Sequence, residues 1–268
     1  MLRTWALFAS LAPAALAQTA TATLPLTLDQ REEFLKTARL VRTRPASKGI
    51  TGALRATLSD GNITHDAHIQ TIDERKLKFV GTRGTEINFR DTYKFNIAAY
   101  RLGRLLGLGG MIPPSVDRVY AGTHASFTWW IDDVIGDEQS RLSNKITPPD
   151  LDSLARQLRI QQVFDQLIYN TDRNQGNTLY DKNWRLWMID HSRAFRLYTT
   201  LKDKKKLQRC DRQLLAKLKQ LDESTLDREL GQWLGRGEIK GILARRDRIV
   251  AIFEKLGPAS LYTWLPEQ

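Results

Sequence analysis

The sequence contains a single cysteine, Cys210, in a chain of 268 residues. One cysteine cannot close an internal disulfide, so no bridge within the chain can hold the fold together. Its context, LQRCDRQLL, has the apolar spacing of an amphipathic helix, which predicts a packed thiol rather than a nucleophile.

Histidine is scarce too. His65 and His68 stand on an expected strand without a cysteine or a third histidine close to them, so we interpret them as surface residues and not as zinc ligands.

Beyond its first residues, the sequence lacks any hydrophobic run long enough to span a membrane. The start reads MLRTWALFASLAPAALAQ, in which one basic residue, Arg3, precedes an apolar run from Trp5 to Leu16 that ends in small residues. This pattern is typical of a secretory signal peptide, with an uncleaved interfacial anchor as the alternative. We therefore expect residues 1–17 to be removed and residues 18–26 to form a flexible lead. The mature protein would be exported, to a periplasm, a secretory-pathway lumen or the medium.

Acidic residues are outnumbered, with 30 Asp and Glu against 41 Lys and Arg, which gives a formal net charge of +11. The excess is concentrated between Arg196 and Lys219, where nine basic residues accompany two aspartates. Such a segment can face an anionic lipid, a cell-envelope polymer or an acidic protein, and a solvated helix face is the alternative. Nucleic acid is not an expected partner, because an exported protein rarely meets it.

The periodicity of apolar residues divides the chain into a strand-rich first half and a helix-rich second half. Strands are expected at 53–58, 67–72, 76–81, 115–122 and 125–136, and helices at 27–43, 91–108, 150–170, 207–222, 224–234 and 238–256. The first two strands flank a turn signal at Asp60-Gly61-Asn62. This order predicts an α+β protein with two lobes, a strand-rich N-lobe with one main helix over residues 27–140 and a helical C-lobe over residues 141–268.

The stretch YNTDRNQGNTLYDKNWRLWMID, from Tyr169 to Asp190, gathers small oxygen-bearing side chains next to an apolar strand. Two short strands, TLYD and RLWMID, flank a turn, and the hairpin brings Asp190 back towards Asn177, while Asp172 follows the preceding helix. Phosphoryl transfer needs one carboxylate to orient the attacking hydroxyl, and a carboxylate and an amide oxygen to hold magnesium. The spacing of Asp, four residues, Asn and a downstream Asp matches the protein-kinase template. The alternative is an ordinary polar helix exit and hairpin.

The segments NTDRNQGN and MIDHSRAF resemble the catalytic segment of atypical kinases, namely phosphatidylinositol-kinase-like proteins, HipA-type kinases and secretory-pathway kinases of the Golgi casein kinase type. AAYRLGRLLGLGGMIPPSVDR is similar to the helix and following strand of their first lobe. The resemblance spans roughly residues 48–250, and its specific part is 165–195. It implies a two-lobed protein-kinase-like fold that binds ATP with Mg²⁺ or Mn²⁺. It also implies that Asp172 is the catalytic base and that Asn177 and Asp190 are metal ligands.

Two departures from the family lie in the catalytic segment itself. Asn174 stands where lipid kinases have histidine, and His191-Ser192 stands where protein kinases have Phe-Gly. The first lobe departs further. Kinases use a strand lysine to contact the α- and β-phosphates and a helix glutamate to hold that lysine. Here the strand offers His68 or Gln70 and the helix offers Asn96, so both members of the ion pair are missing together.

A substitute for the missing lysine could come from other basic residues of the first half: Lys76, Lys78 or Lys94. In SKGITGAL, Gly49 and Gly52 permit a turn that covers phosphates. We therefore predict that Gly49, Gly52 and Gln70 contact the nucleotide.

These observations predict an exported kinase-like protein that transfers the γ-phosphoryl group of ATP to a hydroxyl of a protein or small molecule. The first alternative is a pseudokinase that binds metal or nucleotide without turnover and acts as a scaffold, which the missing ion pair favours. The second alternative is a binding protein of the cell envelope that uses its basic face.

Overall fold

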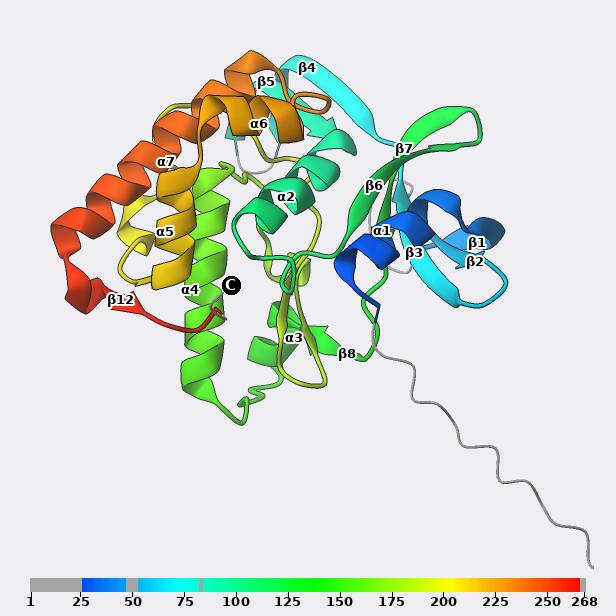
Figure 1. Ribbon diagram of the computed structural model, residues 1–268, viewed down its shortest axis with the longest axis horizontal. Helices are drawn as coiled ribbons and strands as arrows, with labels where there is room; N and C mark the ends of the chain where they lie inside the picture. Colours follow the sequence, from blue (N-terminus) through cyan, green and yellow to red (C-terminus); the bar gives the residue numbers. More distant parts are fainter. Residues whose placement is uncertain (1–25, 47–52, 82–83, 266–268) are drawn as a thin grey trace, which may run out of the picture.

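The computed structural model describes residues 26–46, 53–81 and 84–265, with most strands on one side and most helices on the other (Figure 1). The first half contains α1 (Leu28–Thr37), β1 (Arg39–Pro45), β2 (Leu54–Ser59), β3 (Thr64–Gln70), β4 (Asp73–Gly81), β5 (Gly84–Thr92), α2 (Lys94–Leu105), β6 (Ser115–Tyr120) and β7 (Thr123–Trp129). Next come β8 (Val134–Asp137), α3 (Glu138–Ser143), α4 (Leu151–Leu167), the 3-10 turn η1 (Gln175–Asn177), β9 (Thr178–Asp181) and β10 (Leu186–Met188). The remaining elements are η2 (Lys204–Lys206), β11 (Cys210–Asp211), α5 (Arg212–Gln220), α6 (Glu223–Leu230), α7 (Arg236–Leu256), η3 (Pro258–Ser260) and β12 (Leu261–Tyr262). The predicted α+β fold class, with a strand-rich first part and a helical second part, is confirmed.

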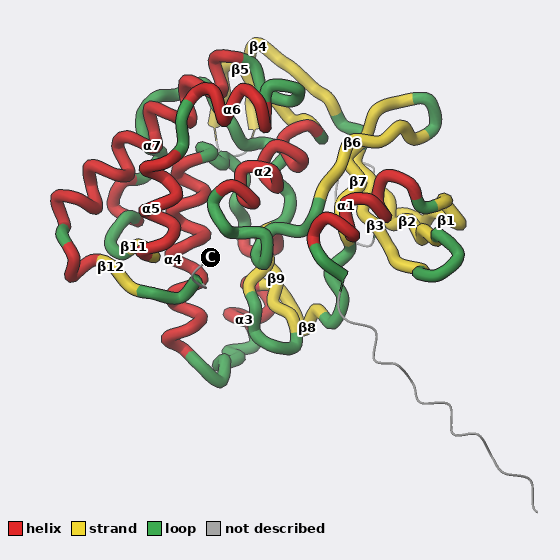
Figure 2. The backbone as a smooth tube through the Cα atoms, in the orientation of Figure 1, coloured by secondary structure: helices red, strands yellow, loops and turns green. Residues whose placement is uncertain are grey.

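A five-stranded antiparallel sheet in the order β1-β2-β3-β7-β6 forms the strand-rich part (Figure 2). Its β2–β3 turn is built by Asp60, whose Oδ1 accepts a hydrogen bond from the backbone nitrogen of Asn62 at 2.8 Å, while Gly61 takes a positive φ of 97°. α1 packs on β6 and β7 and begins with a capping box between Thr27 and Gln30. The apolar faces of α1 and the sheet enclose the smaller of two hydrophobic cores.

α2 connects the two parts, because it packs against β6 and β7 and also against α6 (Figure 1). Its apolar side chains belong to the larger core, which the helices of the second half share. The β4–β5 hairpin forms a separate two-stranded sheet. Two backbone hydrogen bonds fix the end of this hairpin that leads into α2. The backbone nitrogen of Tyr93 donates to the carbonyl of Ile72 at 2.7 Å, and that of Thr92 donates to the carbonyl of Ser192 at 3.0 Å. The end of β5 and the start of α2 therefore lie against the segment that follows β10.

Arg245, on α7, is fully buried and joins two segments of the helical part. Its Nε donates to the carbonyl of Leu167 at the end of α4 at 2.6 Å, and its Nη1 donates to the carbonyls of Arg196, at 3.0 Å, and Tyr198. Burial lowers the pKa of Arg245 to about 10. None of the helices in the described ranges is both long and apolar enough to cross a bilayer.

The helix ends differ from the prediction by a few residues, and two of them, the end of α1 and the start of α5, differ most. α1 ends at Thr37 rather than running to residue 43, because residues 39–45 pair with β2 instead. α5 begins at Arg212 rather than at residue 207, because the Asp211 carboxylate caps the first free nitrogens of the helix. Cys210 therefore lies in the short strand β11 and not in a helix. Its thiol is buried as predicted, and burial raises its pKa.

Candidate active site

The loop that follows α4 is ordered by the buried side chain of Asn170. Its amide nitrogen donates to Asp165 on α4 at 3.2 Å, and its amide oxygen accepts from the backbone nitrogen of Asp172 at 2.9 Å. The side chain of Asp172 is 27% exposed and its carboxylate lies 3.8 Å from the guanidinium of Arg193. The backbone of Asp172 is thus fixed while its carboxylate stays accessible.

Asn177 lies beside Asp172 in the folded loop, since its Nδ2 donates to the carbonyl of Asp172 at 3.2 Å. With the nitrogen committed to that carbonyl, the amide oxygen is the atom of Asn177 that can face a cation. Asn174, at the position where lipid kinases have histidine, serves the loop backbone. Its Oδ1 accepts from the nitrogen of Gly176 at 2.9 Å and caps η1.

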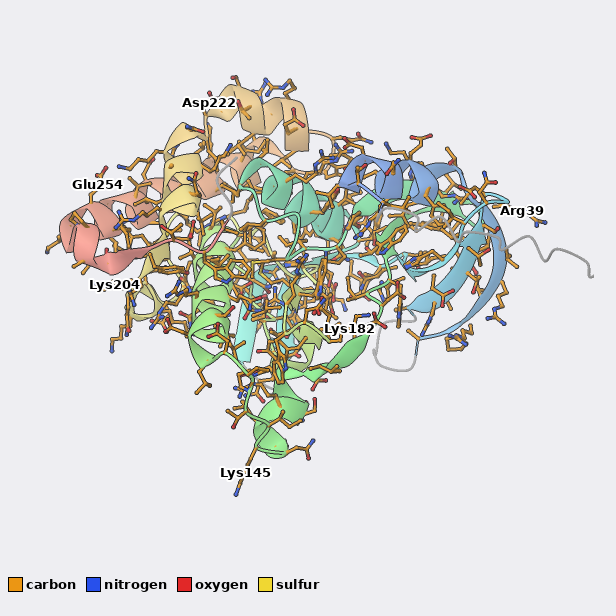
Figure 3. All side chains as sticks on the ribbon, turned by 60° about the horizontal axis from the view of Figure 1, so that its bottom comes forward. Arg39, Lys145, Lys182, Lys204, Asp222 and Glu254 are labelled. Atoms are coloured by element: carbon orange, nitrogen blue, oxygen red, sulfur yellow. The ribbon has the colours of Figure 1, made fainter. Side chains whose placement is uncertain are left out.

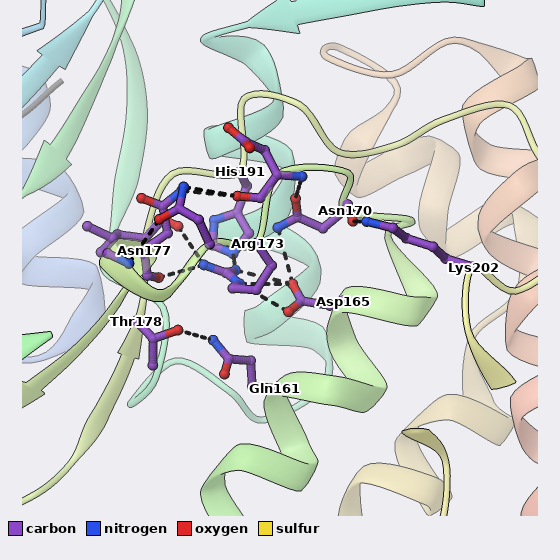
Figure 4. Close-up of polar contacts among 12 residues, drawn as sticks. Gln161, Asp165, Asn170, Arg173, Asn177, Thr178, His191 and Lys202 are labelled. Carbon is purple, nitrogen blue, oxygen red and sulfur yellow. Dashed lines mark hydrogen bonds and ion pairs between the residues drawn. The ribbon is translucent and has the colours of Figure 1, made fainter. Parts of the chain in front are cut away.

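Arg173 joins three segments with one guanidinium (Figure 4). It forms an ion pair with Asp165 at 3.0 Å, and both side chains are largely buried. Its Nη1 also donates to the carbonyls of Asn177, at 2.6 Å, and Ile189, at 2.9 Å. The loop that carries Asp172 and Asn177 and the exit of β10 are therefore held together from inside. An arginine suits this task because its planar fork presents five donors in fixed directions.

His191 fills the position where protein kinases have phenylalanine. Its ring is buried, packs edge-on against Phe164 and accepts a hydrogen bond at Nε2 from Arg173 at 3.0 Å. Burial, and then the charge of Arg173, hold the pKa of His191 well below its usual value, so the ring is neutral. Its backbone nitrogen donates to Oδ1 of Asn96 on α2 at 2.7 Å. The residue after Asp190 is therefore anchored to both parts of the molecule.

Asp190 is exposed and lies two residues beyond the end of β10. The sequence pattern had predicted it to be the last residue of this strand, and that prediction is wrong. Its φ of 51° is in the left-handed region, which cannot continue a strand and which is costly for a residue other than glycine. Its Oδ1 accepts from the hydroxyl of Ser192 at 3.0 Å. Backbone strain of this kind persists where the surroundings enforce it, and it concentrates at functional sites.

Asp91, at the end of β5, is a site carboxylate that sequence reasoning missed. It is buried, and its Oδ1 has no hydrogen-bond partner among the described residues. Burial raises the pKa of this carboxyl; the side chain of Ser192 opposes the rise, and the nearby carboxylate of Asp190 adds to it. Its burial depends on the contact between β5 and the segment after β10, which no local sequence pattern reveals.

Gln70 and Asn96 face each other, as their positions in the sequence had suggested. Nδ2 of Asn96 donates to Oε1 of Gln70 at 2.5 Å, and both side chains are buried. A neutral hydrogen bond thus stands where the kinase pattern has a lysine–glutamate ion pair. The candidate substitutes Lys76 and Lys94 have their own carboxylate partners, Glu74 and Asp73, each at 2.8 Å. Lys78 is exposed on β4.

The two histidines of β3 are not ordinary surface residues, which corrects their interpretation from the sequence. His65 stacks on Trp129 with ring centroids 3.7 Å apart and bonds Asp132 at 2.7 Å. His68 is half-buried and close to Asp190: burial lowers its pKa, and the Asp190 carboxylate works in the opposite direction. The predicted nucleotide contacts Gly49 and Gly52 lie outside the described residues.

The oxygen donors suit a hard cation. The described residues contain no group of three or more His, Cys, Asp or Glu that could hold a metal ion. Asp190 and Asn177 supply a carboxylate and an amide oxygen, which favour Mg²⁺ or Mn²⁺ over softer metals. Such a cation takes its other ligands from water and from phosphate oxygens. The donor set therefore fits a cation that arrives with a nucleotide, and the orphaned oxygen of buried Asp91 adds a further candidate donor.

The basic segment from Arg196 to Lys219 does not form one continuous surface. Arg196 is buried, and its guanidinium bonds Glu86 at 2.8 Å. Lys202 donates to the carbonyl of Asn170 at 2.9 Å and so supports the loop of the candidate site. The three lysines of η2 are exposed, and Figure 3 shows Lys204 at the periphery of the helical part. The basic surface available to a partner therefore contains fewer residues than the nine counted in the sequence of this segment.

Asp165 and Arg173 were also missed by sequence reasoning, although a signal existed for one of them. Asp165 is a carboxylate at a buried position of α4, and a buried carboxylate needs a partner. The sequence indicates the need but not the identity of the partner. Arg173 follows Asp172 directly in the sequence. A charged residue at such a position is as consistent with a solvent-exposed loop as with a structural ion pair.

Comparisons with known proteins give a likeness of fold. No family model matches the chain, and no curated protein matches it. A solved structure described as a Helicobacter pylori proinflammatory kinase, CtkA, is similar to this chain with a TM-score of 0.50 and 10% sequence identity. The match covers 83% of this chain and 95% of that one. The chain therefore has a kinase-like fold.

Proposed function

We propose that this protein is an exported phosphotransferase that moves the γ-phosphoryl group of ATP to a hydroxyl of a protein or small molecule, with Mg²⁺ or Mn²⁺ as cofactor. The kinase-like fold supports this class of chemistry. The proposed export depends on the signal-peptide pattern of residues 1–17, which lie outside the described residues.

Each site residue has a separate task in this proposal. Asp172 would orient the acceptor hydroxyl and accept its proton, since its carboxylate is accessible on a fixed backbone. Asn177 and Asp190 would hold the divalent cation, which when bound offsets the negative charge of the phosphates. Gln70 would contact the nucleotide through its amide nitrogen, because its oxygen is taken by Asn96.

The observation that carries the proposal is the network around Arg173. One largely buried guanidinium binds Asp165, the carbonyls of Asn177 and Ile189, and the ring of His191. It ties the Asp172–Asn177 loop to the turn that contains Asp190. An ordinary polar loop does not need a buried ion pair to fix its shape, whereas a phosphoryl-transfer site depends on positioned groups.

The test compares Asp172→Asn with Asp190→Asn in nucleotide binding and in transfer from γ-labelled ATP. Asp190→Asn should weaken binding of metal–ATP, because a neutral amide no longer opposes the charge of the cation. Asp172→Asn should bind nearly as the wild type does and lose about 10²–10⁴ in turnover. Binding is measured by thermal stabilisation, where ligand at 100 times its Kd adds about 2.7 kcal/mol.

Asp152→Asn is the matched control, because Asp152 is a 78% exposed carboxylate on α4 and should leave binding and turnover unchanged. Should Asp190→Asn fail to fold, Asn177→Ala takes its place. The proposal is wrong if ATP with Mg²⁺ or Mn²⁺ neither stabilises the wild type nor donates phosphate to any acceptor offered.

The second candidate is a pseudokinase, which the neutral Gln70–Asn96 pair favours. Without a lysine at this position, the α- and β-phosphates lose a charged partner, and a bound nucleotide is less well aligned for transfer. The same measurements separate the two candidates. Stabilisation by metal–ATP without transfer to any hydroxyl supports the pseudokinase, and stabilisation with transfer supports the enzyme.

A further inference from the structure

Asp91 carries an unsatisfied group in the described structure. The residue is only 8% exposed, and its Oδ1 lacks any hydrogen-bond partner among the described residues. A buried carboxylate oxygen without a donor is costly, because the protein does not replace the hydration lost on burial. Such a group in a native fold needs a physical explanation, and an ion that joins the site is one.

The neighbours of Asp91 increase this cost. The hydroxyl of Ser192 donates to Oδ1 of Asp190 at 3.0 Å and also lies close to Asp91. A serine hydroxyl carries one hydrogen, so it cannot donate to both carboxylates at once. The backbone bond from the nitrogen of Thr92 to the carbonyl of Ser192, at 3.0 Å, holds the end of β5 against the turn that contains Ser192. Two carboxylates therefore stand near each other with one donor between them.

Two positive groups lie near Asp91, Arg193 and Arg196, and both form ion pairs with Glu86 rather than with Asp91. Arg193 contacts Glu86 and lies 3.8 Å from Asp172. The position that holds a lysine in kinases is occupied by neutral Gln70, bonded to neutral Asn96. Compared with the kinase pattern, the position of Gln70 lacks a positive side chain, and Asp91 is an additional carboxylate. A divalent cation is the species that would balance that charge.

We propose that Asp91 is a ligand of a divalent cation that it shares with Asp190. The end of β5 then supplies a metal ligand from the strand-rich part, in addition to Asn177 and Asp190 from the β9–β10 region. Cation binding would fasten the start of α2 to the turn at residues 190–192 and so couple the two parts of the molecule. This inference rests on the proposed function, since it concerns the same site.

The experiment measures Mn²⁺ binding by electron paramagnetic resonance, with and without ATP, for the wild type, Asp91→Asn and Glu74→Gln. Glu74 is the matched control, because it lies directly across from Asp91 in the β4–β5 register and is exposed. Asp91→Asn should lower the affinity for Mn²⁺ by at least about tenfold, the smallest effect typical of losing a group that supports a metal site. Glu74→Gln should remain close to the wild type.

Thermal unfolding distinguishes a metal-binding role of Asp91 from a purely structural role. Asp91→Asn keeps the shape of the side chain and removes an unpartnered charge, so the metal-free variant should unfold at the same or a higher temperature than the wild type. Mn²⁺ should then stabilise it less than it stabilises the wild type. A metal-free variant that is less stable, with unchanged affinity for Mn²⁺, would overturn the inference.

The remaining outcomes are also decisive. If Asp190→Asn loses Mn²⁺ and Asp91→Asn keeps it, the inference is wrong and the proposed function stands. If the wild type binds no Mn²⁺ even with ATP, both are wrong. Should Asp91→Asn fail to fold, the wild type with Fe²⁺ and ascorbate provides the test. Backbone cleavage is expected near both Asp91 and Asp190, and cleavage near Asp190 alone contradicts the inference.

Discussion

The Gln70–Asn96 contact is a neutral hydrogen bond at a position where kinases have an ion pair. Substitution of these residues tests whether the two side chains act as a pair. Gln70→Lys or Asn96→Glu alone would bury a charge without its counter-charge, which should destabilise the protein by about 3–5 kcal/mol. The double variant restores a complementary pair, so its destabilisation should be smaller than the sum by about 0.5–3 kcal/mol. Urea unfolding of the four proteins measures this coupling. The exposed pair Lys76–Glu74 serves as control and should couple by less than about 1 kcal/mol. Additive effects at Gln70 and Asn96 would show that the two side chains do not act as a pair.

At the scale of elements, α7 holds the end of α4 and the segment after Asp190 through Arg245. Arg245→Met would leave the carbonyls of Leu167, Arg196 and Tyr198 without this donor. Because an unsatisfied buried polar group costs about 1–3 kcal/mol, the variant should lose at least about 3 kcal/mol of unfolding free energy. Arg248→Met is the control, since Arg248 lies one turn further along α7, is exposed and bonds only the carbonyl of Thr199 among the described residues. It should cost less than about 1 kcal/mol. Equal losses in the two variants, measured by urea unfolding, would contradict the role given to Arg245.

At the scale of the whole molecule, the net charge of +11 is spread over surfaces of different kinds. The lysines of η2 are exposed at one end of the helical part (Figure 3), so we predict that they attract anionic surfaces. Changing Lys204, Lys205 and Lys206 to Glu should weaken binding to anionic liposomes, and binding of the wild type should fall as the Debye length shrinks from about 10 Å at 0.1 M salt to about 3 Å at 1 M. A control with Arg39, Lys145 and Lys182 changed to Glu alters the net charge equally at scattered positions (Figure 3). If both triple variants bind the liposomes equally well, net charge and not η2 governs the attraction.

The sequence by itself was sufficient for features that depend on local patterns. Apolar periodicity separated a strand-rich half from a helical half, and the turn at Asp60-Gly61-Asn62 was readable from residue type. Asp172 and Asn177 are five positions apart, so one loop suffices to bring them together. The alignment of Gln70 with Asn96 was also readable, because the resemblance to atypical kinases supplied the pairing of strand and helix. Element ends were less well predicted, since pairing with β2 ended α1 and the Asp211 cap delayed α5.

Only the tertiary structure decided which distant side chains share the site. Asp91 and Ser192 are brought together by the backbone bond between β5 and the segment after β10, and neither segment carries a pattern that specifies the other. The residue type of Arg173 fits a solvent-exposed loop position equally well, and the buried carboxylate of Asp165 draws it inward. Arg196 belongs to a basic run in the sequence, yet Glu86 from the β4–β5 hairpin draws it into the interior. The physical reason is common to all three: a local pattern sets the conformation of a segment, whereas the partner of a buried charge depends on how segments far apart in the chain pack.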